Sequence, residues 1–285
     1  ENEINNKKNF QGIGLIGLRE LVRNCCPPIL LKWLKRVREK EVALFDGSYS
    51  SWSAAQARSN GYDSDEIFQR VLESSLKVKH GDAVFERDSF CFYQEQFRWP
   101  TLACLMAITA QSRGRLNVLD FGGSLGSFYF QHRKFLQKVS DLSWNIVEQS
   151  KFVCYGKNEF QDTRLRFYES IDQAVQENPI NCLFLSSVLQ YLEFPYDVLR
   201  ELAETQAQYL LIDRMPFGVG DADRLTVQHV PESIYKGSYP AWVLSKSKFE
   251  REIENLGYRL IADFPCDEVV HGVEFKGAFF ERIQS

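Results

Sequence analysis

After residue 115 the chain alternates between short apolar runs and longer stretches in which apolar residues recur every three or four positions. The short runs predict strands and the longer stretches predict amphipathic helices, which together form repeated βα units. Because right-handed crossovers place helices on both faces of a parallel sheet, we expect a doubly wound α/β fold. The predicted strands cover residues 117–121, 144–147, 165–168, 182–185 and 209–212, and the predicted helices cover 127–138, 151–160, 171–177 and 196–206.

The last part of the chain departs from this alternation. At 215–244, aromatic residues stand among glycines and prolines, and we expect an irregular insert that covers the sheet. A helix is expected at 246–256, and two strands are expected at 258–263 and 277–283 with no helix between them. Since a short connection joins strands only in an antiparallel sense, we expect a mostly parallel, seven-stranded sheet with an antiparallel last strand.

The segment before residue 115 has a different pattern. Turn-forming residues dominate 46–65, an amphipathic helix is predicted at 65–77, and the almost wholly apolar stretch at 101–111 predicts a buried helix. We therefore expect an N-terminal segment at 1–45, a helical cap at 46–114 and a main domain at 115–285 that contains the insert.

The N-terminal segment is basic and amphipathic. Pro27 and Pro28 can start a helix whose apolar residues share one face, with lysines and arginines opposite, up to residue 40. Such a helix either packs on the protein's own body or contacts an anionic membrane surface or a partner. The pattern leaves both possibilities open.

Composition narrows the class of protein. A hydrophobic fraction of 44% with 22 Phe supplies a large core, and a net charge of −4 gives no basic field for nucleic acid, so we expect no nucleic-acid partner. The 7 cysteines include no C-x-x-C pair, which favours reduced thiols and predicts no metal site. We expect a cytoplasmic protein, peripheral at the inner membrane face if the basic helix binds lipid. The oligomeric state is left open.

A glycine-rich turn follows the first predicted strand of the main domain. The segment reads Val118-Leu-Asp-Phe-Gly-Gly-Ser-Leu-Gly126, and a helix is expected directly after it. In a parallel α/β sheet the first βα turn usually supplies the ligand site, and glycines let the backbone approach a ligand closely. The serines at 124 and 127 have amides and hydroxyls that can bond a carboxylate at the helix N-terminus.

Glu148 adds a second signal, because it ends the next predicted strand. A carboxylate there can accept hydrogen bonds from ribose hydroxyls, so the pair of signals predicts a nucleoside-type cofactor. The spacing D-x-G-G-x-x-G, rather than G-x-G-x-x-G, and the expected antiparallel last strand favour S-adenosylmethionine over a dinucleotide.

These features resemble those of class I methyltransferases, whose first motif is an acidic residue followed by alternating glycines. Asp120, Gly122 and Gly126 match that motif, while Ser124 stands at the position of the middle glycine. The segment 182–193 resembles the fourth-strand region of the same enzymes. A narrower resemblance, to methyltransferases associated with bacterial surface-polysaccharide biosynthesis, rests on the glycine turn with Gly61-Tyr-Asp63, Glu86-Arg-Asp88 and Asp213-Arg-Met-Pro-Phe217.

The resemblance implies a Rossmann-like methyltransferase fold that uses S-adenosylmethionine. It further implies methylation of a hydroxyl of a saccharide or another small polar acceptor in surface-glycan biosynthesis. By position it assigns the methionine part to the turn, the ribose to Glu148, the adenine to the next residue and the start of the third helix, and the sulfonium to the end of the fourth strand. The implied cofactor-binding residues are Asp120, Gly122, Gly123, Ser124, Gly126, Glu148, Gln149, Ser170, Ile171, Ser186 and Ser187.

Methyl transfer from a sulfonium is an in-line displacement, which needs alignment but no metal or covalent intermediate. An alcohol acceptor would gain from a general base, and the candidates after the fourth and fifth strands are His229, Asp213 and Tyr191. Asp213 is alternatively half of an ion pair with Arg214. Glu86, Arg87 and Asp88 are either acceptor ligands or a solvated charge cluster. A non-catalytic adenosyl-binding scaffold and a nicotinamide-dependent oxidoreductase remain as alternative functions.

Overall fold

The computed structural model describes residues 44–59, 64–230 and 237–283. The basic helix predicted up to residue 40, with its membrane contact, lies outside these residues. Among the helices that the structure describes, none has the length and apolar character needed to cross a bilayer. The division of the chain at about 45 and 114 stays a prediction.

Five parallel strands form the centre of the main sheet, in the order β6-β5-β4-β7-β8. All five correspond to the predicted strands. The order reverses beside β4, so the turn after β4 lies at the switch point, where open α/β sheets bind ligands. The strands are β4 (Arg115–Phe121), β5 (Asp141–Val147), β6 (Leu165–Tyr168), β7 (Cys182–Ser186) and β8 (Tyr209–Gly218).

The last two strands extend this sheet beyond β8. β11 (Tyr258–Val270) and β12 (Val273–Arg282) form an antiparallel hairpin, and β12 pairs antiparallel with β8. The seven strands in the order β6-β5-β4-β7-β8-β12-β11 have the expected mostly parallel arrangement with antiparallel pairing at the end, and they belong to a sheet that has ten strands in the described residues. The expected doubly wound, Rossmann-like α/β fold is confirmed.

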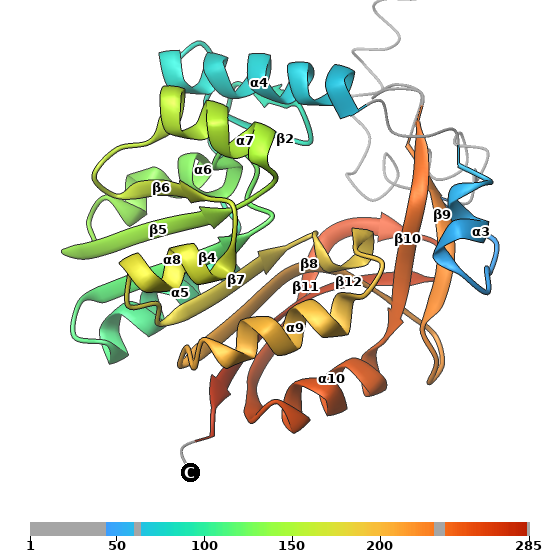
Figure 1. Cartoon of the computed structure of the whole chain (residues 1–285). Coiled ribbons are helices and arrows are strands. Elements are labelled where there is room, and N and C mark those ends of the chain that lie inside the picture. Colours follow the sequence, from blue (N-terminus) through green and yellow to red (C-terminus); the bar gives the residue numbers. More distant parts are fainter. Residues whose placement is uncertain (1–43, 60–63, 231–236, 284–285) are drawn as a thin grey trace, which may run out of the picture. The chain divides into compact units, whose positions relative to one another are not determined.

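Helices cover both faces of the sheet, as expected for a doubly wound fold (Figure 1). Neighbouring strand residues alternate between two cores: Phe184 packs in the core under the first group of helices and Leu185 in the core under the second. The first group is α4 (Ser64–His80), α5 (Trp99–Gln111), α6 (Ser127–Leu136) and α7 (Ser150–Tyr155), which a π-helix (Gly156–Phe160) continues; the second is α8 (Ile171–Glu177), α9 (Pro195–Glu204) and α10 (Lys246–Asn255).

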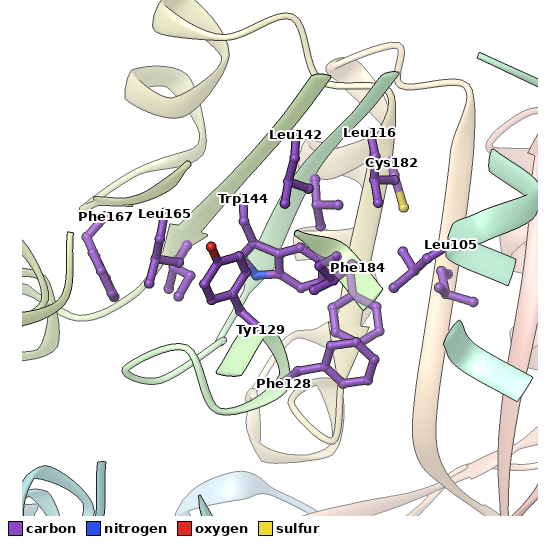
Figure 2. Close-up of a cluster of buried hydrophobic side chains, with 14 of the residues drawn as sticks. Leu105, Leu116, Phe128, Tyr129, Leu142, Trp144, Leu165, Phe167, Cys182 and Phe184 are labelled. Atoms are coloured by element: carbon purple, nitrogen blue, oxygen red, sulfur yellow. The ribbon is translucent and has the colours of Figure 1, made fainter. Parts of the chain in front are cut away.

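Trp144 is the centre of the first core (Figure 2). Its ring lies 5.8 Å from that of Phe128 and 5.9 Å from that of Tyr129, both on α6, and 5.8 Å from that of Phe184 on β7. This packing joins the helix after the glycine turn to the strands on either side of β4. Aromatic side chains of this size contribute most to the stability of a core.

The expectation of an irregular insert at 215–244 is wrong, because strands occupy most of this range. β8 continues to Gly218, and β9 (Arg224–His229) and β10 (Ser238–Ser245) form an antiparallel pair, with β10 parallel to the end of β8. The glycines, prolines and tyrosines obscured a period of two in the sequence, and the pairing of β9 with β10 makes these segments strands. Pro240 is tolerated because, among the described residues, β10 pairs with β8 at Leu244 and Ser245 and not at position 240.

The part before β4 is helical, with additional short strands that the sequence did not predict. β1 (Phe45–Asp46) pairs with β9, and α3 (Trp52–Gln56) packs on β9 and β10. β2 (Phe85–Arg87) and β3 (Phe90–Phe92) form a hairpin. Its two turn residues, Asp88 (φ 52°) and Ser89 (φ 66°), both have positive φ, which is typical of a type I′ turn.

Candidate functional site

The glycine turn after β4 is held on two sides. Gly122 has a φ of 75°, and its N–H donates to the carbonyl oxygen of Val147 at the end of β5 (2.9 Å). A Cβ added at Gly122 would overlap the Val188 side chain, and one added at Gly123 would overlap the Asp120 carboxyl group. Both positions therefore require glycine, because neighbouring side chains fill the space that a Cβ would take.

Ser124 adopts the conformation that a glycine would adopt without strain. Its φ is 55°, in the left-handed region that glycine adopts most easily. For a residue with a side chain that conformation costs roughly 1–2 kcal/mol. A serine therefore stands at a backbone position that favours glycine.

Glu148 connects the turn to the end of β5. Its Oε1 accepts a hydrogen bond from the backbone N–H of Ser124 (3.2 Å), and its Oε2 accepts one from the N–H of Gln149 (2.9 Å). Burial raises the pKa of Glu148, although both hydrogen bonds act against this shift. Since a carboxylate has about four acceptor positions, each oxygen can accept a further bond, as two ribose hydroxyls would require.

Asp120 lies beneath the turn and is 1% exposed. Its Oδ2 accepts a hydrogen bond from the indole N–H of Trp144 (2.8 Å). Burial raises its pKa to about 7, against the effect of that hydrogen bond. The carboxyl group thus contacts the core on one side and Gly123 on the other, which suits a residue that supports the turn from below.

The remaining predicted cofactor residues lie at the same edge of the sheet. Gln149 is exposed at the start of α7, and Ser170 caps α8 by accepting a hydrogen bond from Gln173 N–H (3.3 Å). Ile171 packs in the second core and is 4% exposed. Ser186 ends β7, and Ser187 follows it with a φ of 55°. Contact of these residues with a cofactor stays a prediction.

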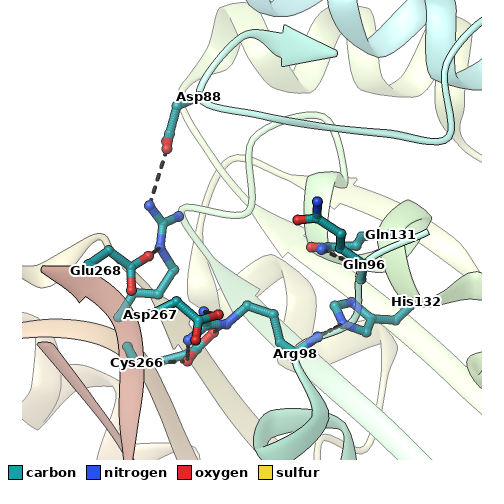
Figure 3. Close-up of polar contacts among 10 residues, drawn as sticks. Asp88, Gln96, Arg98, Gln131, His132, Cys266, Asp267 and Glu268 are labelled. Atoms are coloured by element: carbon teal, nitrogen blue, oxygen red, sulfur yellow. Dashed lines mark hydrogen bonds and ion pairs between the residues drawn. The ribbon is translucent and has the colours of Figure 1, made fainter. Parts of the chain in front are cut away.

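Asp213 is buried, and both of its carboxylate oxygens accept hydrogen bonds from Arg98, the residue before α5. Figure 3 labels Arg98 among its polar neighbours. Arg98 Nε donates to Oδ2 (2.8 Å) and Nη2 donates to Oδ1 (2.6 Å). The alternative that Asp213 forms an ion pair with Arg214 is therefore wrong, because the partner of Asp213 is Arg98. The two side chains are neighbours in a β-bulge, where β12 pairs with Ile212 and then with Met215, and they contact different groups.

Arg214 is the residue of this bulge that follows Asp213, and its φ is 58°. It donates through Nε to Glu268 on β11 (2.6 Å) and through Nη2 to Asp88 in the turn between β2 and β3 (3.1 Å). β-bulges commonly redirect a side chain beside an active site. Here the bulge directs Arg214 to the β2–β3 hairpin and so connects the cap with the carboxyl-terminal part of β8.

Tyr191 lies near this arginine. It belongs to a short helical turn (Leu189–Tyr191) after β7, and its ring meets that of Tyr239 on β10 edge to face, with centroids 5.2 Å apart. Burial is the main cause that raises the pKa of Tyr191, the charge of Asp88 raises it further, and the charge of Arg214 acts in the opposite direction. The phenol is therefore protonated at neutral pH and is a hydrogen-bond donor there.

His229 lies on the other face of the β9–β10 pair. Gln228 is paired with Tyr239, so their side chains share a face, and the adjacent His229 points to the opposite one. On that face Val227 packs with Ala55 of α3. His229 lines a hollow of about 460 Å³ there, together with Asp46, Gly47, Ser48, Tyr49, Arg58 and Val227.

Three side-chain oxygens near Tyr191 are buried and accept no hydrogen bond from the described residues: Gln190 Oε1, Gln228 Oε1 and Glu268 Oε2. Gln190 precedes Tyr191, Gln228 is paired with Tyr239, and Glu268 bonds Arg214. Buried acceptors without donors are costly, so groups of this kind commonly mark a place where a ligand or water donates.

No pattern in the sequence pointed to several of these residues. Arg98 is 115 positions from Asp213, and His132 accepts a hydrogen bond from the N–H of Arg98 (2.9 Å) only because α5 and α6 are packed together. Gln190, Gln228 and Glu268 follow no motif. A period of two at 224–229 could have predicted the strand that carries Gln228.

Comparisons with known proteins give likenesses of backbone only. No family model and no curated protein matches the chain. Among solved structures, the N-terminal domain of EvdMO1 in the presence of SAH and D-fucose is 16% identical over 78% of this chain and 98% of that chain, with a TM-score of 0.47. Magnesium protoporphyrin IX methyltransferase from Synechocystis PCC 6803 with bound SAM is 11% identical over 65% and 78%, with a TM-score of 0.43. Burkholderia thailandensis 1,6-didemethyltoxoflavin-N1-methyltransferase is 11% identical over 84% and 93%, with a TM-score of 0.42.

Proposed function

We propose that the protein is an S-adenosylmethionine-dependent methyltransferase. The observation that carries the proposal is the hydrogen bond between the Ser124 N–H and Glu148, which joins the glycine turn after β4 to the acidic residue after β5 at the switch point of the sheet. A nucleoside-type cofactor needs both groups within reach of one molecule. In this chain they are in direct contact.

The residues present fit this cofactor. The turn contributes backbone without side chains at Gly122 and Gly123, and Glu148 retains acceptor positions for ribose hydroxyls. In the proposal the turn up to Gly126 holds the methionine part, with Asp120 as its support. Gln149, Ser170 and Ile171 flank the adenine, and Ser186 and Ser187 lie near the sulfonium. When bound, the cofactor supplies an electrophilic methyl group.

The acceptor is proposed to bind at Tyr191. Around it, the unsatisfied oxygens of Gln190, Gln228 and Glu268 call for a molecule that offers several hydrogen-bond donors. A saccharide offers hydroxyl groups in this way, and its methylated atom would be one of them. A small polar acceptor rich in hydroxyl or amino groups is the wider class. Membership of surface-glycan biosynthesis rests on the sequence resemblance alone.

The proposed mechanism depends chiefly on alignment. Tyr191, protonated because burial raises its pKa, donates a hydrogen bond that orients the acceptor. Holding two reactants in line can supply a large part of the rate for a displacement of this type. Asp213, fully paired with Arg98, and His229, on the other face of β9, are less suitably placed to take a proton than the sequence indicated.

Calorimetry of the full chain with S-adenosylhomocysteine and with NAD tests the proposal. We expect binding of the first and none of the second, followed by release of S-adenosylhomocysteine from S-adenosylmethionine when an acceptor from a panel of sugar nucleotides is present. Binding of NAD alone would favour an oxidoreductase. Cofactor binding without turnover on any acceptor would favour a non-catalytic scaffold.

A further inference from the structure

Glu86 is a buried carboxyl group at the end of the glycine turn. It lies on β2, is 3% exposed, and accepts a hydrogen bond from the Ser127 hydroxyl. Ser127 is the first residue of α6 and follows Gly126 directly. From the sequence we expect the amides and hydroxyls of this helix N-terminus to be able to bond a ligand carboxylate; the structure shows the Ser127 hydroxyl bonded to a carboxyl group of the protein.

No lysine or arginine of the described residues forms an ion pair with Glu86. Its neighbour Arg87 points to the other face of the hairpin, where its guanidinium lies 5.4 Å from the ring centre of Phe92. Cys91, paired with Glu86 across the hairpin, is uncharged and donates to the carbonyl of Ser74. An acid this deeply buried without a cation is costly, so a cationic ligand group would be strongly complementary to it.

We propose that Glu86 binds the α-ammonium group of the methionine part of the cofactor. The inference rests on the proposed function, because it takes the methionine part to lie along the turn that ends at Gly126. A methionine carboxylate at the same place would meet a like charge. The hairpin that carries Glu86 is itself fixed to β8 by the contact between Asp88 and Arg214, so the cap contributes directly to cofactor recognition.

The environment of Glu86 supports a change of charge on binding. Burial raises its pKa to about 7; the Ser127 hydrogen bond lowers it, the Asp88 charge raises it, and the Ser89 N–H and Arg87 charge lower it. A cation beside the carboxylate favours the ionised form. Affinity for an ammonium-bearing ligand should therefore increase as pH rises from about 5.5 to 8.

The test compares S-adenosylhomocysteine with 5′-methylthioadenosine, which has the same nucleoside but lacks the amino-acid part. In wild-type protein both ligands should bind. Glu86→Gln keeps the size of the side chain and a polar contact for Ser127. We expect it to weaken binding of S-adenosylhomocysteine roughly 10- to 100-fold, the range for a lost charged hydrogen bond, and to leave binding of 5′-methylthioadenosine within about 3-fold. The pH dependence of S-adenosylhomocysteine affinity should flatten in this variant.

Glu86→Asp serves as the charge-preserving control and should recover part of the lost affinity. Equal weakening of both ligands by Glu86→Gln, or no weakening of either, would overturn the inference while wild-type binding upheld the proposed function. If wild-type protein bound neither ligand, the proposed function itself would fail. Melting temperatures of all three proteins establish that the folded state is retained.

Discussion

Arg98 and Asp213 form a bidentate ion pair between the start of α5 and the bulge of β8, with N–O distances of 2.8 and 2.6 Å. Asp213 is completely buried and Arg98 nearly so. Because this geometry uses both carboxylate oxygens, we interpret Asp213 as a residue that positions the end of β8 and the cap relative to the sheet.

Removing one charge of this pair should destabilise the fold. We expect Asp213→Asn to lower the free energy of unfolding by roughly 3–5 kcal/mol, because it leaves the Arg98 guanidinium buried without its partner. Urea unfolding measures this change. Asp197→Asn, which removes an exposed partner of Arg200, is the matched control and should change stability by less than about 1 kcal/mol. An Asp213→Asn protein with wild-type stability and lost turnover would instead support a general base.

Ser124→Gly should stabilise the protein. The glycine removes the cost of a positive φ at position 124, and part of this gain is offset by the greater conformational entropy of glycine in the unfolded chain. We expect a net increase of roughly 0.5–1 kcal/mol in the free energy of unfolding, with cofactor affinity retained through the backbone N–H. Ser150→Gly, at a position without positive φ, should be destabilising in the same denaturation experiment.

His132 should make stability depend on pH. Its Nε2 accepts the Arg98 N–H and its Nδ1 donates to the carbonyl oxygen of Phe128, while burial, the largest cause, lowers its pKa to about 4 from a usual 6.5. The unfolded chain then binds more protons than the native state between pH 6.5 and 4, so stability falls as pH falls through that window. The contribution lost between pH 7 and 5 should be about 2 kcal/mol.

Glu86 and Asp120 make stability depend on pH in the opposite direction to His132. Their raised pKa values make the free energy of unfolding fall as pH rises from about 4 to 7. The His132 contribution must therefore be measured as a difference between wild type and His132→Gln. The difference in the free energy of unfolding between the two proteins should decrease by about 2 kcal/mol as the pH falls from 7 to 5. A difference that stayed constant would show that the imidazole titrates alike in the folded and unfolded chains.

Glu148→Ala should weaken binding of S-adenosylhomocysteine by about 1–3 kcal/mol, since the ribose hydroxyls and the Ser124 N–H lose their acceptor. Calorimetry measures the affinity. Glu204→Ala is the control, because Glu204 is exposed at the end of α9, which leads to the start of β8 at the opposite edge of the sheet. Equal affinities in the two variants would contradict the ribose role of Glu148.

Tyr191→Phe should lower turnover of the acceptor roughly 10-fold and leave cofactor affinity unchanged, because the variant loses only the hydroxyl that orients the acceptor. His229→Ala, which alters the other face of β9, should retain most of the turnover. Both are assayed by release of S-adenosylhomocysteine. A loss of 100-fold or more in His229→Ala would restore His229 as the general base predicted from the sequence.

The sequence by itself determined the central α/β pattern and the position of the glycine turn. Apolar runs that indicate strands, and 3.6-residue periods that indicate helices, can be read within short stretches of sequence. For example, α8 begins and ends where its pattern predicted. The distance between the turn and Glu148 is likewise local, because one βα unit separates them. The contact that joins Ser124 to Glu148 could therefore be expected from spacing.

Only the tertiary structure decided which distant side chains meet. The partner of Asp213, the burial of Glu86 against Ser127 and the face on which His229 lies follow from a bulge, a helix-to-hairpin contact and the register of β9 on β10. A shift of one residue in register would reverse the face of His229, and no local pattern fixes that register. Packing between elements decides which groups surround a buried charge, whereas the sequence records only the order of the residues along the chain.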